Sequence, residues 1–107
     1  MCIGGYKMSY RLEKFTRAIE DLIGLGSIQE RLYRAFTYNL LQLHQDDFPE
    51  EHLRQRFENL TDSLTCREAI GDEGTAWATI SVMTDEECLT YAQRIFNLFL
   101  EFSERDN

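Results

Sequence analysis

Residues 84–103 read TDEECLTYAQRIFNLFLEFS, an amphipathic pattern that decides the fold class of the chain. Thr84 and Glu87 have the spacing of a capping box, which predicts a helix from Asp85 to about Ser103. On a helical wheel the apolar side chains of this segment occupy an arc of about 200°. A helix that faces a single core needs an apolar arc of only ~100°. The excess width of this arc predicts either that other helices of the bundle cover both flanks of the helix, or that part of its apolar surface docks another chain.

The rest of the chain also repeats its apolar residues every three or four positions, which is the period of a helix. Ser27 and Glu30 form a second capping box, and Pro49 suits the first turn of a further helix. The predicted fold class is therefore all-α, a compact bundle of four longer helices plus one short helix. The predicted helices cover about 10–24, 28–44, 49–64, 75–82 and 85–103.

The domain organisation follows from length and composition. A chain of 107 residues with one proline and no Ser/Gly/Pro-rich linker fits one domain. Residues 1–8 include Gly4 and Gly5 and lack an apolar run, so we expect a flexible N-terminal tail. We expect residues 9–104 to form a single helical domain.

The cysteines and the hydropathy bear on the compartment. The three cysteines are odd in number and far apart, and none belongs to a C-x-x-C pair. This pattern is typical of a reducing environment rather than of a disulfide scaffold. No run of ~18 apolar residues is present, so the sequence predicts no transmembrane span. Together these features predict a cytoplasmic protein.

Charge is unevenly distributed along the chain. Residues 1–43 contain six basic and four acidic side chains, whereas residues 44–107 contain five basic and fifteen acidic ones, giving the net charge of −8. Such a surface repels nucleic acid and anionic membranes. We therefore expect no direct nucleic-acid or membrane partner, and a protein partner or a second copy instead.

Residues that could carry chemistry are few and poorly spaced. His44 and His52 lie near acidic residues, but their spacing matches no metal-binding pattern on one helical face. Neither Cys66 nor Cys88 has a histidine nearby in sequence that could activate it. The sequence therefore predicts no catalytic residue, no metal and no cofactor, and a protein that is not an enzyme.

The first functional hypothesis is a small, acidic, non-enzymatic interaction module: an adaptor, a regulatory subunit or a homo-oligomer. Aromatic and large apolar anchors dominate the binding energy of protein interfaces. The wide apolar arc of the last helix, together with the short helix before it, supplies such anchors. The predicted partner-binding residues are Trp77, Leu89, Tyr91, Phe96, Leu98 and Phe102.

The alternative hypothesis is an inhibitor that mimics nucleic acid and occupies the basic channel of a DNA- or RNA-handling complex. The acidic second half of the chain motivates it, since electrostatic steering would make such binding fast and sensitive to salt. The predicted acidic face consists of Asp46, Asp47, Glu50, Glu51, Glu58 and Asp62.

Overall fold

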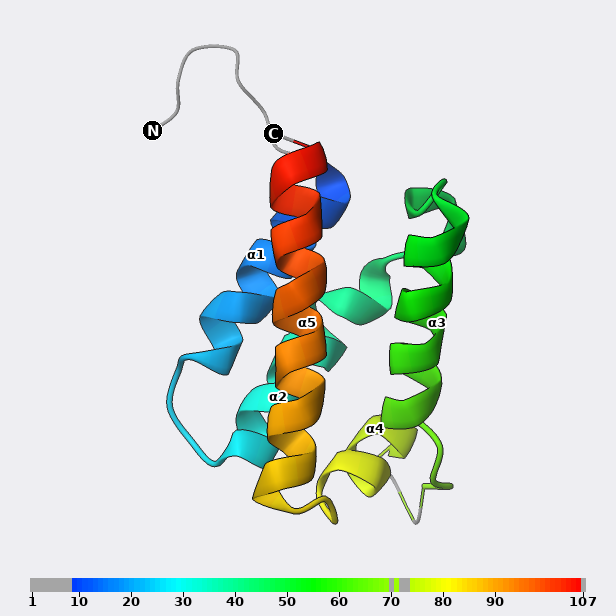
Figure 1. The fold of residues 1–107 in the computed structure, drawn as a ribbon. Coiled ribbons are helices and arrows are strands. Elements are labelled where there is room, and N and C mark those ends of the chain that lie inside the picture. The colour runs from blue at the N-terminus through cyan, green and yellow to red at the C-terminus, as the bar shows by residue number, and fades with distance from the viewer. Residues whose placement is uncertain (1–8, 70, 72–73, 107) are drawn as a thin grey trace.

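The computed structural model describes residues 9–69, 71 and 74–106. This part of the chain is all-helical, contains no strand and forms a compact bundle, which confirms the predicted fold class (Figure 1). The expected tail, residues 1–8, lies outside the described residues. The α-helices are α1 (Tyr10–Leu22), α2 (Ile28–Tyr38), α3 (Glu51–Leu64), α4 (Gly74–Ile80) and α5 (Asp85–Arg105), and two short 3₁₀ turns, η1 (Leu40–Gln42) and η2 (Gln45–Asp47), join α2 to α3.

Helix α5 is the longest element and runs through the length of the bundle (Figure 1). It packs against α1, which runs in the opposite direction, and against α2 behind them. Helix α3 lies on the outside, and the short α4 connects its end to α5. The start of α1 and the end of α5 consequently lie at the same end of the molecule.

The predicted helix starts are confirmed at three caps. Ser9 Oγ accepts a hydrogen bond from the Leu12 backbone N–H at 3.1 Å. Ser27 with Glu30, and Thr84 with Glu87, form complete capping boxes. These contacts satisfy backbone N–H groups that a helix leaves without partners in its first turn.

Helix α2 ends at Tyr38, earlier than the predicted 44. Asn39 is buried, and its Nδ2 donates to the Asp21 carboxylate at 2.8 Å and to the Ala35 carbonyl at 3.2 Å. An asparagine side chain that bonds to the backbone competes with helix continuation. The chain bends here, and η1 with the residues after it brings Leu40 and Leu43 into the core.

Helix α3 begins at Glu51, with Glu50 at the N-cap, so Pro49 lies before the helix rather than in its first turn. The carboxylate of Glu50 pairs with Arg11 of α1 and does not cap the helix. Arg54 Nη1 donates to the Phe48 carbonyl at 3.0 Å, which ties α3 to the segment that precedes it.

Four phenylalanines form the aromatic centre of the core, one from each of α1, the η2–α3 connection, α3 and α5. The Phe102 ring lies 5.2 Å from Phe15 and 5.7 Å from Phe48 between centroids. Phe48 stacks on Phe57 at 4.5 Å. This cluster joins elements that are distant in sequence, so it fixes α3 against the α1–α5 pair.

Candidate protein-docking surface

The six residues predicted on the apolar docking face divide into three groups. Leu98 and Phe102 are 2% and 0% exposed, so both belong to the core and are removed from the docking face. Trp77 and Tyr91 are half-buried, and the Trp77 ring packs edge-on against Tyr33 at 5.1 Å. Only Leu89 and Phe96 are exposed, at 57% and 39%.

The wide apolar arc of α5 explains this division. Its centre, which includes Cys88, Ile95, Leu98 and Phe102, is covered by the protein's own helices. One edge of the arc extends beyond that cover, and there Leu89, Phe96 and Leu100 are exposed to solvent. Part of the apolar arc therefore packs on the core, and the other part is exposed to solvent.

The exposed edge continues onto α1. A groove of about 230 Å³ lies between the two helices, with Ile19, Leu22 and Ile23 on one side and Leu89, Ala92, Gln93 and Phe96 on the other. Ile23, just after α1, is 78% exposed, and Leu100 is 46% exposed one helical turn beyond Phe96. We name this region the α1–α5 surface; it comprises Ile19, Ile23, Leu89, Gln93, Phe96 and Leu100.

The sequence interpretation missed the α1 side of this surface and Leu100. A usable signal is the segment Ile23-Gly24-Leu25-Gly26, where two large apolar residues alternate with glycines in a turn. A turn exposes its side chains to solvent, so Ile23 and Leu25 are poor candidates for the core. Leu25 is 90% exposed.

Arginines from α2 hold this turn in place. Arg31 donates to the Leu22 carbonyl at 2.8 Å and to the Gly26 carbonyl at 3.1 Å. Arg34 Nη2 donates to the Leu25 carbonyl. Cationic donors at the end of a helix satisfy its last carbonyls and match its dipole. The turn is thus fixed by its backbone, while Ile23 remains in solvent.

The exposed apolar area of the α1–α5 surface is in the size range of functional apolar patches. From their exposed fractions, Ile23, Leu89, Phe96 and Leu100 together present on the order of 400 Å², which lies in the ~300–600 Å² range of patches that are often functional. Leu25 is exposed in the same turn as Ile23, and the other exposed large apolar side chains of the described residues come from separate places in the chain. They are Tyr10, Tyr38, Leu41 and Val82.

The elements that carry the surface are also nearly neutral. Helix α1 has three basic and three acidic side chains, and residues 88–100 of α5 have one charged side chain, Arg94. The whole chain, by contrast, carries −8. Low charge around an apolar patch is typical of the centre of a protein interface.

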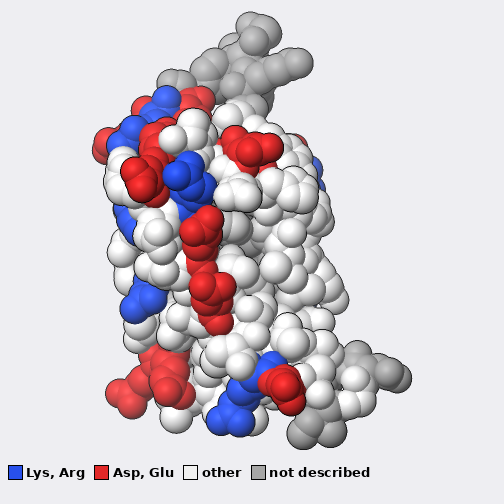
Figure 2. Space-filling model, turned by 90° about the vertical axis from the view of Figure 1, so that its right-hand side faces the viewer, with Lys and Arg blue, Asp and Glu red and all other residues white. Residues whose placement is uncertain are grey.

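The six residues of the predicted acidic face do not share one role. Glu50 pairs with Arg11, and Asp47 accepts a hydrogen bond from the His44 backbone N–H at 2.8 Å. Glu51 is exposed at the start of α3. On the side of the molecule where α3 lies, Figure 2 shows acidic side chains in separate groups, with uncharged surface between them and basic side chains beside some.

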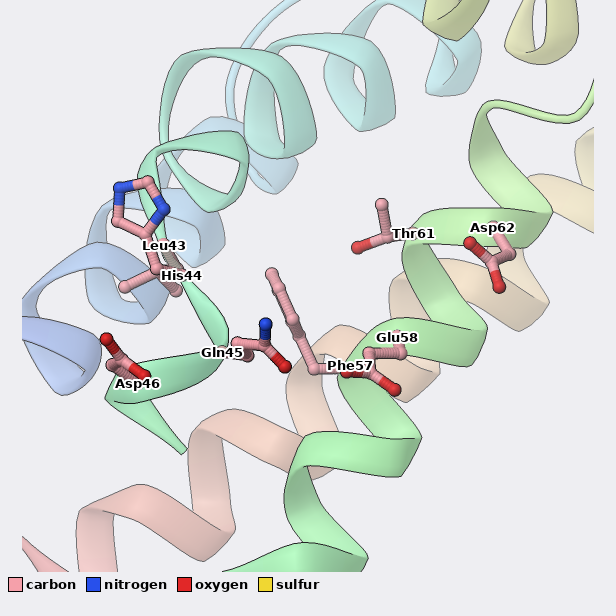
Figure 3. A pocket seen from close by; sticks show the side chains of 8 residues that line it. All are labelled: Leu43, His44, Gln45, Asp46, Phe57, Glu58, Thr61 and Asp62. Atoms are coloured by element: carbon pink, nitrogen blue, oxygen red, sulfur yellow. The ribbon is translucent and has the colours of Figure 1, made fainter. Parts of the chain in front are cut away.

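The remaining three acids, Asp46, Glu58 and Asp62, line an open cavity of about 510 Å³ (Figure 3). The segment 43–46 forms one wall of the cavity and α3 forms the other, with Phe57 between them. His44 also lines it. Within the described part of the chain, no group of three His, Cys, Asp or Glu side chains is arranged to bind a metal ion.

Arg11 is the one buried cation of the described core, and it links the start of α1 to the end of α5 and to the start of α3. Its guanidinium donates to both Asp106 oxygens at 2.7 and 2.9 Å, to both Glu50 oxygens at 2.6 and 2.8 Å, and to the Asp47 carbonyl at 3.1 Å. These bonds use all of the N–H donors that an arginine offers. Ser9 Oγ donates to Asp106 at 2.6 Å. Because every donor is satisfied within the protein, we assign this Arg11 cluster to stability.

The Arg11 cluster shifts the ionisation of its members. Hydrogen bonds from Arg11 hold the pKa of Glu50 at about 2, against an ordinary 4.5, although burial opposes the shift. Arg11 lowers the pKa of Asp106 in the same way, and Ser9 adds to that effect. The two carboxylates in turn raise the pKa of Arg11.

This shift predicts acid sensitivity. A carboxylate whose pKa is lower in the folded state stabilises the fold fully above its ordinary pKa, and this contribution is lost as the pH falls. For Glu50 the window runs from about 4.5 down to about 2. We expect the free energy of unfolding, measured in urea, to fall through this window less steeply in Glu50→Gln than in the wild type. Equal slopes would contradict the assignment.

The two described cysteines differ in environment. Cys88 is fully buried in α5, and burial raises the pKa of its thiol, with Asp85 and Glu87 adding to the rise. Cys66 is exposed just after α3, and both are free thiols. Cys88 is therefore a small core residue.

None of the described helices is long and apolar enough to cross a membrane. Comparison with models of known protein families, with curated proteins and with solved structures found no match.

Proposed function

We propose that the protein is a non-enzymatic interaction module that docks another protein chain on its α1–α5 surface. The observation that carries the proposal is the exposed stripe of Leu89, Phe96 and Leu100, in which Gln93 is the one polar member, beside the groove at Ile19 and Ile23. A stripe of this kind on one helix, with a neighbouring groove, is the usual means by which helical surfaces recognise a partner helix.

The fixed backbone around the surface supports this function. Helices α1 and α5 are held by the core, and the turn that presents Ile23 is held by Arg31 and Arg34. A surface whose backbone is already ordered loses less conformational entropy when a partner binds. Adaptor and regulatory roles both require such a surface.

The nucleic-acid-mimicking inhibitor remains the alternative. Asp46, Glu58 and Asp62 around the cavity on α3 would carry it, and its partner would be basic. The two functions respond to salt in opposite ways. Binding of a basic partner weakens as salt increases, whereas apolar docking persists or strengthens.

We also propose a cytoplasmic location. The free thiol of Cys66 is exposed, and an exposed free thiol is more compatible with a reducing compartment than with an oxidising one.

Photo-cross-linking tests the proposed surface. Benzoylphenylalanine replaces Phe96 in one version of the full chain and the exposed Gln55 of α3 in another, and both are irradiated in an extract of the source cells. We expect a product of defined mass in severalfold higher yield from position 96. Adding Leu100→Glu should reduce that yield at least about tenfold, because it places a charge in the docked stripe.

The outcomes of this experiment distinguish docking at the α1–α5 surface from its absence. A product from position 96 that Leu100→Glu removes supports docking at this surface, whether the partner is the same chain or a different one. Equal yields from positions 96 and 55, or a product insensitive to Leu100→Glu, would refute the proposed function.

A further inference from the structure

We propose that the chain which docks on the α1–α5 surface is a second copy of this protein, with the two α5 helices packed antiparallel about a two-fold axis. This inference rests on the proposed function and names its partner. Three features of the surface carry it: the spacing of the stripe, the position of the groove and the size of the exposed apolar area.

The residues of the stripe have the same spacing whether α5 is read from its N-terminus or from its C-terminus. Leu89, Gln93, Phe96 and Leu100 are separated by four, three and four residues, so they share one face of α5. A two-fold axis through the middle of this segment places Leu89 opposite Leu100 of the second copy. It also places Phe96 opposite Gln93 of the second copy. A two-fold interface requires this kind of self-complementary patch.

The groove provides space for the contacts that the axis creates. It lies beside Leu89 and Phe96, on the side of α1, and has a volume of about 230 Å³. Leu100 of the second copy, seated opposite Leu89, is adjacent to this groove and can fill it. The same contact occurs twice, so both grooves are filled and no exposed stripe remains.

The size of the surface fits a dimer of modest affinity. A typical interface buries ~800 Å² per partner, of which roughly 60% is apolar. The exposed apolar area of the α1–α5 surface, on the order of 400 Å², accounts for most of the apolar part of such an interface. Polar residues at the rim of α1 and α5 supply the remaining interface area. We expect a dissociation constant in the micromolar range, because interfaces of this size without a large buried anchor often bind with such affinity.

The charge distribution permits the two copies to approach along the middle of α5 but opposes their approach at the two ends of the helix. The middle of α5 carries only Arg94, so the stripes meet without like-charge repulsion. Antiparallel packing brings Asp85, Glu86 and Glu87 of one copy toward Glu101 and Glu104 of the other, while Arg105 is already paired with Glu101 at 2.7 Å. Salt screens this repulsion, so the dimer should tighten as salt increases.

Sedimentation equilibrium of the full chain over a wide concentration range tests the dimer. We expect the average mass to rise with concentration from 12.6 kDa toward twice that value, and to rise at lower concentration in ~0.5 M salt than in ~0.05 M salt. Leu89→Glu should raise the dissociation constant at least about tenfold, whereas Gln55→Glu, with the same added charge on α3, should leave it unchanged.

A charge-complementation experiment tests the pairing itself. In the double variant Leu89→Glu/Leu100→Lys, the new carboxylate at position 89 of each copy faces the new ammonium group at position 100 of the other copy. We therefore expect dimer formation to recover. Within one helix these positions are about 16 Å apart, too far to pair with each other. The matched double variant Leu89→Glu/Gln55→Lys has the same net charge and should not recover.

A monomer at every concentration and at both salt concentrations would overturn the inference, as would a dimer insensitive to Leu89→Glu or a failure of the Leu89→Glu/Leu100→Lys variant to recover. The proposed function would survive that result if position 96 still cross-links to a protein of different mass. Absence of any preferential cross-link at position 96 would instead refute both.

Discussion

We expect Phe102→Ala to lower the free energy of unfolding by about 4 kcal/mol, the largest effect of any substitution considered for this chain. The Phe102 side chain is fully buried and contacts both Phe15 and Phe48 edge-on or tilted. The Arg11 guanidinium also lies over its ring, 4.3 Å from the centroid. Alanine would leave a cavity where three elements meet, and it would remove a cation–π contact.

Phe96→Ala is the matched control on the same helix. Phe96 is 39% exposed and lies outside the core cluster. We expect a loss of about 1 kcal/mol, because its ring is only partly removed from water. Urea unfolding at low protein concentration, where self-association is negligible, measures both variants. Similar losses for the two substitutions would contradict the assignment of Phe102 to the core and of Phe96 to the surface.

We expect Arg11→Met to lower the free energy of unfolding by about 3 kcal/mol at neutral pH. Methionine keeps much of the apolar length of the side chain but removes all of the donors to Glu50 and Asp106. The two carboxylates would then face each other without Arg11 between them, and the start of α1 would lose its ion pairs with Glu50 and Asp106, while Arg105 of α5 would still contact Glu50 at 3.8 Å. Loss of a partner from a partly buried ion pair costs more than the pair itself contributes.

Arg17→Met separates this effect from a general loss of positive charge. Arg17 lies on the same helix, is 60% exposed and pairs with Glu13 at 3.5 Å. Exposed pairs of this kind contribute at most about 0.5 kcal/mol. Urea unfolding of both variants at pH 7 makes the comparison. If Arg17→Met were as destabilising as Arg11→Met, the structural role given to the Arg11 cluster would be wrong.

The fold class and most helix bounds could be predicted because they depend on local rules. The capping boxes at Ser27 and Thr84 involve residues three positions apart, and the 3.6-residue period identifies the helices between them. The end of α2 could not be predicted from local sequence. It depends on Asn39 reaching Asp21 in another helix, a contact that only the assembled bundle creates.

The docking surface could be predicted only in outline. The width of the apolar arc on α5 indicates that the helix has more apolar surface than one core contact requires. Which edge is exposed depends on where α1 and α2 pack, and the sequence does not specify that. The pattern alone therefore places Leu98 and Phe102 on the surface, which is wrong, and it omits Leu100 and Ile23.

The role of Arg11 could not be predicted from the sequence either. Its partners Glu50 and Asp106 are 39 and 95 residues away. Long-range ion pairs leave no local spacing pattern, so no motif could reveal them. The same pairing removes Glu50 from the predicted acidic face.

The sharpest test of the α1–α5 surface is the photo-cross-linking yield at position 96 divided by that at position 55, measured with the full chain in an extract of its source cells. We expect a ratio well above one that falls toward one when Leu100→Glu is added. A ratio near one in the unsubstituted background would show that no chain docks beside Phe96.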